Sequence, residues 1–174
     1  MSSRVQSFAP LVTAQSRVLV LGSMPGVESL NAKQYYAHPR NAFWRIMAEL
    51  FQFSVALDYG ARCEALMDSG VGLWDSMREC ERPGSLDSAV VDATIEANDF
   101  ASLFARHGQL RHVFFNGAKS EQVFKRHVLP TLPADCVAEL GMRRLPSTSP
   151  AHASLNFAQK LSAWTAVRDA MDVR

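Results

Sequence analysis

The chain has 174 residues, a length that favours one domain able to bury its own core without a metal or disulfides. Its 48% hydrophobic and 20% charged residues are close to the average of globular proteins. The formal net charge is only +1, so composition does not indicate a nucleic-acid-binding protein, and any contact with DNA must come from local basic loops.

The first part of the chain alternates strand and helix. Residues 1–16 are expected to form an N-terminal arm whose apolar side chains dock on the core, and the apolar run after it predicts a strand over 17–23. Apolar residues at helical spacing then predict a helix over 41–53. A second helix is predicted over 61–69, because Gly70 is well suited to the position just after a helix end.

The same alternation continues to the C-terminus. The expected elements are, in order, a strand over 71–74 leading into Asp75, a loop over 82–88, a helix over 99–107, a strand over 111–116, a helix over 118–127 closed by Pro130, a strand within 136–145, a loop over 147–153, and a last helix capped by Ser154 that faces the core with Phe157, Leu161, Trp164 and Met171. This order predicts an α/β fold, a three-layer sandwich in which a four-stranded parallel sheet has helices on both faces. We expect a single domain over 1–174.

Three of the predicted strands end in polar loops. Their sequences are GSMPG (22–26), NGAKS (116–120) and LPSTSPAHA (145–153). Because the carboxyl ends of parallel strands lie at one edge of a sheet, we expect these loops to converge. The glycines of the first loop allow a flat or phosphorylated ligand to approach the backbone. The sequence therefore predicts a binding site at this edge.

Several kinds of site are excluded by spacing. The three cysteines form no CxxC pair and the five histidines show no HxxxH spacing, so we expect no disulfide framework, no metal and no other cofactor. The first loop is GxxxG rather than GxGxxG, Ser23 lies one position too early for a nucleophile elbow, and no P-loop lysine is present. No signal sequence or apolar run of about 18 residues is found, which predicts a cytoplasmic protein without membrane contact.

Taken together, the loops carry a family resemblance. GSMPG, YYAHPRNAFW (35–44), VFFNGAKS (113–120) and LPSTSPAHA resemble the uracil-DNA glycosylase superfamily, in the same order along the chain. These motif sequences are most similar to those of its hypoxanthine-DNA (deoxyinosine) glycosylase family. The resemblance implies a monofunctional enzyme that removes a deaminated base, preferably hypoxanthine, from DNA by hydrolysis of the N-glycosidic bond in base excision repair. It implies DNA as the partner, no obligatory protein partner, and a monomer.

Met24 marks a difference within the superfamily. The mismatch-specific uracil glycosylases hold a water-positioning asparagine at this place of the motif, and a thioether cannot orient water by a strong hydrogen bond. One alternative is nevertheless a mismatch-specific uracil/thymine-DNA glycosylase on the same fold, which Met24 disfavours. The other is a non-catalytic relative that binds nucleic acid or nucleotides, which Met24 leaves open.

The resemblance assigns roles to three side chains. Asn41 is the candidate catalytic residue, which positions water or steadies the leaving base, although an asparagine before a helix is also a preferred N-cap. Tyr36 would stack on the extruded base, or belong to the core. Asn116 would read the base edge with its amide, or cap the helix that follows. The first loop adds the base-binding candidates Gly22, Ser23 and Met24.

The rest of the candidate site contacts DNA. The expected residues are Pro25, Gly26, His38, Arg40, Lys119, Ser147, Thr148, Ser149, Pro150 and His152. Hydroxyls and amides of 147–149 suit phosphates, and Pro150 with Ala151 suits a wedge into the base stack, unless this segment is only a turn. His38 is more suited to holding its own loop. Neither Lys33 nor Lys119 is expected to be buried enough to form an imine, so no lyase activity is predicted.

Overall fold

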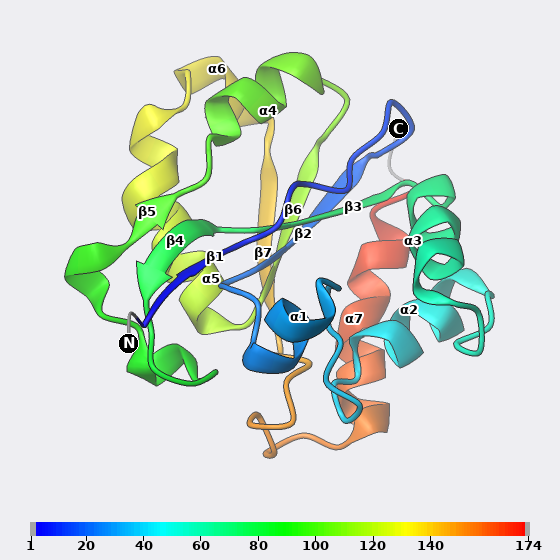
Figure 1. Cartoon of the computed structure of the whole chain (residues 1–174). Helices are drawn as coiled ribbons and strands as arrows, with labels where there is room; N and C mark the ends of the chain where they lie inside the picture. Colours follow the sequence, from blue (N-terminus) through cyan, green and yellow to red (C-terminus); the bar gives the residue numbers. More distant parts are fainter. Residues whose placement is uncertain (1–2, 173–174) are drawn as a thin grey trace.

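A four-stranded parallel sheet lies at the centre of the molecule (Figure 1). The computed structural model describes residues 3–172. The strands, in spatial order, are β3 (Val71–Asp75), β2 (Val18–Gly22), β6 (His112–Asn116) and β7 (Gly141–Leu145). These are the four predicted strands, and their pairing is parallel throughout.

Helices cover both faces of this sheet because its strands are apolar on both sides. Val18 and Val20 of β2 pack in one cluster with Phe43, Trp164 and other side chains, whereas Leu19 and Leu21 pack in a second cluster. On the first face lie α2 (Phe43–Phe51), α3 (Tyr59–Asp68) and α7 (Phe157–Asp169), and on the second lie α4 (Phe100–Arg106), α5 (Ala118–Val123) with the π-helical turn Phe124–Val128 that continues it, and α6 (Ala134–Glu139) (Figure 1). The predicted three-layer sandwich is confirmed.

The cap of the last helix differs from expectation. Gly70 follows α3 with φ of 90°, as predicted for a residue after a helix end. Ser154, however, does not cap the last helix. Asn156 does, because its Oδ1 accepts from the Gln159 amide at 2.9 Å while the Gln159 side chain accepts from the Asn156 amide at 2.9 Å. This capping box satisfies two amide donors at once, which a serine two residues earlier cannot do.

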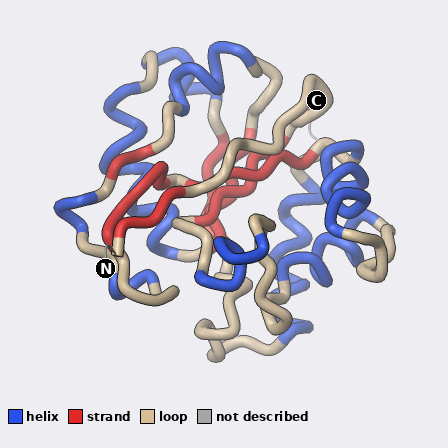
Figure 2. Tube along the Cα trace, viewed as in Figure 1, coloured by secondary structure: helices blue, strands red, loops and turns tan. Residues whose placement is uncertain are grey.

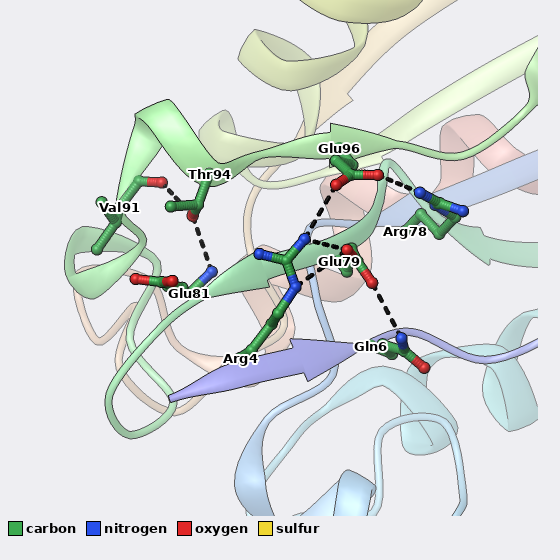
Figure 3. A network of polar contacts seen from close by, with 8 residues as sticks. All are labelled: Arg4, Gln6, Arg78, Glu79, Glu81, Val91, Thr94 and Glu96. Carbon is green, nitrogen blue, oxygen red and sulfur yellow. Dashed lines mark hydrogen bonds and ion pairs between the residues drawn. The ribbon is translucent and has the colours of Figure 1, made fainter. Parts of the chain in front are cut away.

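A second, antiparallel sheet was not predicted. Its order is β1-β4-β5, from β1 (Arg4–Gln6), β4 (Met77–Glu81) and β5 (Glu96–Ala97). Arg4, Gln6 and Arg78 bind the carboxylates of Glu79 and Glu96 across it (Figure 3). Each such exposed pair contributes little, so the backbone pairing is the main contact. Residues 1 and 2 of the expected arm over 1–16 lie outside the described residues. Within the rest, Arg4–Gln6 form a strand, and Phe8 and Leu11 beyond it dock on the core as predicted.

The two sheets are joined where the site lies. β4 begins two residues after β3 ends, so the small sheet fixes the direction in which β3 leaves the central sheet. The loop after β2 leads into α1 (Val27–Ala32), and in Figure 2 this loop and the loop after β7 lie at the same, lower end of the sheet. Among the described residues no helix is long and apolar enough to cross a membrane.

Trp164 gives a test of the packing between α7 and the sheet. Its ring is fully buried and packs edge to face on Phe43, with the ring centroids 6.1 Å apart. Its Nε1 donates to the Pro146 carbonyl at 2.9 Å. We expect Trp164→Ala to lower the free energy of unfolding by about 3–5 kcal/mol, because it leaves a cavity that cannot collapse. Chemical denaturation measures this loss. Ser162→Ala, on an exposed position of the same helix, should change stability by less than about 0.5 kcal/mol. Equal effects of the two changes would contradict the packing.

Candidate active site

One cavity of about 1080 Å³ opens at the edge of the sheet where the strands end. Every residue predicted for the site from the sequence lines it: Gly22, Ser23, Met24, Pro25, Gly26, Tyr36, His38, Arg40, Asn41, Asn116, Lys119, Ser147, Thr148, Ser149, Pro150 and His152. The expected convergence of the three loops is therefore seen. The individual roles of these residues stay predictions.

Thr148 ties its own loop to the end of β6 and to the start of α2. Its backbone amide donates to Asn116 Oδ1 at 2.9 Å, and its Oγ1 accepts from Asn116 Nδ2 at 2.9 Å. Its carbonyl accepts from the Ala42 amide at 3.0 Å, next to Asn41. Both Asn116 and Thr148 are buried, so these bonds are shielded from competing water. The loop after β7 is thus locked onto the end of β6 and onto the start of α2.

Asn116 does not cap the helix that follows it. That position is taken by Gly117, whose φ of 94° is a backbone conformation open mainly to glycine. The reciprocal pair with Thr148 uses one donor and one lone pair of the Asn116 amide. One N–H and one lone pair remain for a base.

Asn41 has a local structural role as well as a place in the cavity. Its Oδ1 accepts from the Phe43 amide at 3.0 Å, which supports the first turn of α2, while Ala42 holds the N-cap position itself. α2 therefore begins two residues later than the predicted start at 41. Since the carbonyl oxygen is engaged with the backbone, the NH₂ group is the part of Asn41 best placed to bind a ligand.

Tyr36 is held in an unusual backbone conformation. Its φ is 55°, in the left-handed region that bulky residues rarely occupy. Its ring stacks on that of Phe43, with the ring centroids 4.0 Å apart and 25° between the planes. The hydroxyl is buried without a hydrogen-bond partner among the described residues. Burial raises the pKa of this phenol well above 10, and the Asp75 charge adds to the effect, with a smaller opposing contribution from Asn116. Strain of this kind is typical of functional sites.

The first loop is clamped from behind. Arg82, almost fully buried, donates to the carbonyls of Met24 at 3.3 Å and Pro25 at 2.5 Å. The Met24 side chain packs in an apolar cluster that also contains Met77 and Val90. The Met24 side chain therefore contributes to packing, while its predicted part in base binding stays a prediction.

Around the cavity, polar contacts hold the basic residues in place. His38 Nδ1 accepts from the Arg40 amide at 3.1 Å, which fits the predicted role of His38 in holding its own loop. Lys119 pairs with Asp92 at 2.5 Å. Beneath the last loop the buried Lys160 donates to the Ser149 carbonyl at 3.2 Å, and burial lowers the pKa of its amine.

Sequence reasoning missed Asp75 as a site residue. It is the last residue of β3, lies opposite Gly22 of β2, and lines the cavity with only 4% of its surface exposed. Its Oδ2 has no hydrogen-bond partner among the described residues. Burial raises the pKa of this carboxyl to about 7, the Arg82 charge opposes the rise, and the Asp87 charge adds to it. An acidic residue ending an apolar strand was the only signal in the sequence.

The comparisons with known proteins agree with this geometry. Residues 9–168 match the Uracil DNA glycosylase superfamily. The chain belongs to this superfamily.

Two relatives of the chain carry a name narrower than that of the superfamily. The chain is 37% identical over 116 residues to a hypoxanthine DNA glycosylase of Methanosarcina barkeri (strain Fusaro / DSM 804) and 34% identical over 116 residues to one of Methanosarcina acetivorans, in each case over 66% of this chain and 72% of the relative. A solution NMR structure from Methanosarcina acetivorans, provisionally described as a uracil DNA glycosylase, superposes with a TM-score of 0.78 at 31% identity, over 97% of this chain and 99% of the other.

Gly22 tests how tightly the site is built. A Cβ at this position would lie 2.4 Å from Asp75 Oδ1 and 3.2 Å from the Tyr36 hydroxyl. We expect Gly22→Ala to lower the free energy of unfolding by about 1–3 kcal/mol, because it forces buried groups apart. Gly108→Ala is the matched control, since a Cβ there meets nothing within 4 Å. Thermal unfolding of both variants measures the effect. If Gly22→Ala unfolds at the wild-type temperature, a Cβ at position 22 is not crowded by Asp75 and Tyr36.

The raised pKa of Asp75 predicts a pH dependence of stability. The folded protein keeps a proton on this carboxyl up to about pH 7, whereas the unfolded chain releases it near the ordinary pKa of 3.8. The folded state therefore loses stability as the pH rises from about 4 to about 7, by on the order of a few kcal/mol.

Asp75→Asn should remove this loss. Its free energy of unfolding, relative to that of the wild type, is expected to increase across the same pH range in urea denaturation. Asp68→Asn, at an exposed position on α3, serves as the control and should leave the slope in place. Parallel curves for wild type and Asp75→Asn would show that the carboxyl is ionised in the folded protein at these pH values.

Proposed function

We propose that this protein is a monofunctional hypoxanthine-DNA glycosylase, which hydrolyses the N-glycosidic bond of a deaminated base in DNA and starts its excision repair. The observation that carries the proposal is the single cavity on which the three motif loops converge, in a chain of this superfamily that is similar to two hypoxanthine DNA glycosylases. We further propose a cytoplasmic monomer that needs no cofactor, metal or protein partner.

The dimensions of the cavity support the binding of an extruded nucleotide. A base inside a duplex is out of reach, so it must be turned outward at a cost of a few kcal/mol, which is smallest for a mispaired base such as hypoxanthine. A cavity of about 1080 Å³ has room for a nucleotide and parts of its neighbours. Lys119, Arg40 and the amides around Ser149 line it and suit phosphates. Their contacts would offset the cost of extrusion.

The proposed chemistry is hydrolysis without a covalent enzyme intermediate. The C1′–N9 bond breaks and its electron pair leaves with the purine, a water oxygen bonds to C1′ and that water gives up one proton, and the purine takes up one proton. Asn41 would orient that water or steady the leaving base, and one well-placed dipole of this kind supplies about 3–4 kcal/mol. Lys119 is paired with Asp92, and Lys33 is exposed, so neither suits an imine mechanism. The abasic strand should therefore stay unbroken.

A uracil-specific activity of the mismatch type is the second candidate. It has the fold in its favour, but Met24 packs among apolar side chains where that mechanism requires a polar group that holds water. We therefore expect deoxyinosine to be the better substrate of the two.

Asn41→Ala tests the proposal on a duplex that contains one deoxyinosine. Wild type should release free hypoxanthine and leave a site that breaks only after alkali. Asn41→Ala should lower the single-turnover rate by about 10²–10³-fold, because the oriented dipole is lost. Base release is followed by chromatography and strand integrity by denaturing gel.

The matched control is Asn31→Ala, an exposed asparagine on α1 that does not line the cavity. It should cleave at the wild-type rate. A matching uracil duplex ranks the two substrates. If wild type binds deoxyinosine DNA but releases no base, the protein is a binding relative and the proposal is wrong.

A further inference from the structure

Two buried polar groups of the cavity have no hydrogen-bond partner among residues 3–172. They are Asp75 Oδ2 and the Tyr36 hydroxyl, and both side chains approach the small space in front of Gly22. Buried polar groups are almost always hydrogen-bonded, so two exceptions at one place call for an explanation. A ligand that enters the cavity would supply the missing partner.

Most other polar side chains of the cavity are already engaged. Asn116 binds Thr148 through both ends of its amide, Ser23 donates to Asp87 at 2.5 Å, and Lys119 pairs with Asp92. Asp75 differs from them because one of its carboxyl oxygens is buried and has no partner in the described part of the chain.

We propose that Asp75 is a catalytic residue of the glycosylase reaction, whose carboxyl in its acid form donates a proton to the leaving purine. This inference rests on the proposed function. It deepens that function by naming the group that activates the base, in addition to the Asn41 amide.

The O–H bond of the Asp75 carboxyl breaks and its proton bonds to the purine ring nitrogen N7. The C1′–N9 bond breaks and its electron pair returns to the ring, so hypoxanthine leaves as a neutral molecule. Water bonds to C1′ and releases a proton to solvent, and the Asp75 carboxylate is reprotonated from solvent before the next turnover.

The surroundings favour the acid form. The charged and titratable groups that act on this carboxyl or line the same cavity are Tyr35, Tyr36, Arg82, Asp87, His38, His152, Lys119, Arg40 and Glu28. Burial raises the pKa of Asp75 to about 7 in spite of Arg82, and it raises the pKa of both tyrosines well above 10, so that they stay neutral. A bound base removes more water and DNA phosphates add negative charge, and both changes favour the protonated carboxyl.

This assignment fits a purine better than a pyrimidine. Hypoxanthine carries N7, a basic ring nitrogen that uracil lacks, and a proton there makes the base a better leaving group. A general acid is most effective when its pKa lies near the working pH. The chemical class of substrate is therefore a purine with an unsubstituted N7.

The test is the pH profile of single-turnover cleavage on the deoxyinosine duplex, from pH 5.5 to 8.5, for wild type and Asp75→Asn. The wild-type rate should fall as the pH rises past about 7, because the acid form is lost. Asp75→Asn should be about 10²-fold slower at pH 6, and its rate should not fall across this range. Its affinity for the duplex should stay within a few-fold of wild type, since an amide has the same shape.

Asp87→Asn provides an independent measurement. The Asp87 charge raises the pKa of Asp75, so removing that charge should move the alkaline fall of the rate to lower pH. This shift, like the wild-type profile, can be read even if Asp75→Asn does not fold, which thermal unfolding will reveal.

The failures of the two proposals are distinct. If Asp75→Asn cleaves at the wild-type rate, or if the wild-type rate increases through pH 7, then Asp75 is not the acid, while the glycosylase proposal stands. If wild type releases no hypoxanthine at any pH, the proposed function itself fails.

Discussion

The parallel register of the central sheet is the constraint on which the rest of the structure depends. It sets Gly22 opposite Asp75 and Asn116 opposite Leu145, so that four strands deliver their polar continuations to one edge. Neighbouring strands are only about 5 Å apart, which brings residues far apart in sequence to adjoining positions. The site is a consequence of this alignment, because no one loop carries enough groups to hold a nucleotide.

Residues outside the cavity hold the cavity-lining segments in position. The small sheet follows β3 after one residue and brings Arg82 back beneath the first loop, where it clamps two carbonyls. Ser120 at the start of α5 donates to the Leu21 carbonyl at 2.8 Å and lies 3.0 Å from the Ser76 hydroxyl. These buried bonds hold the ends of β2, β3 and β6 at fixed distances, which is the rigid support that a precise site requires.

Several features of the cavity lower the stability of the folded protein. Tyr36 has a left-handed backbone, and its phenol and the Asp75 carboxyl, which lie close to Gly22, each carry a buried oxygen without a partner among the described residues. Each lowers stability, and large apolar clusters on both faces of the sheet offset the loss. A loss of stability confined to a cavity, in a fold that is otherwise well packed, is expected where a bound ligand supplies the missing contacts.

Local pattern was enough to predict much of this fold. Apolar runs and helical spacing gave the four central strands and most helices, and the three loop motifs marked the residues that line the cavity, because these signals depend on near neighbours in sequence. The family followed from the same motifs. The strands β1, β4 and β5 escaped prediction because they are short, partly charged, and paired across long separations.

Tertiary structure alone decided the roles of several polar groups. The sequence shows Asn116 as a candidate cap or reader of bases, but only the fold brings Thr148 against it. The sequence also shows Asp75 as an ordinary acidic residue after a strand. Its burial and its raised pKa arise from groups packed around it, among them Gly22 and Tyr36, which lie elsewhere in the chain, and the Arg82 charge only opposes the rise. Desolvation is a property of everything packed around a group, so no local pattern can reveal it.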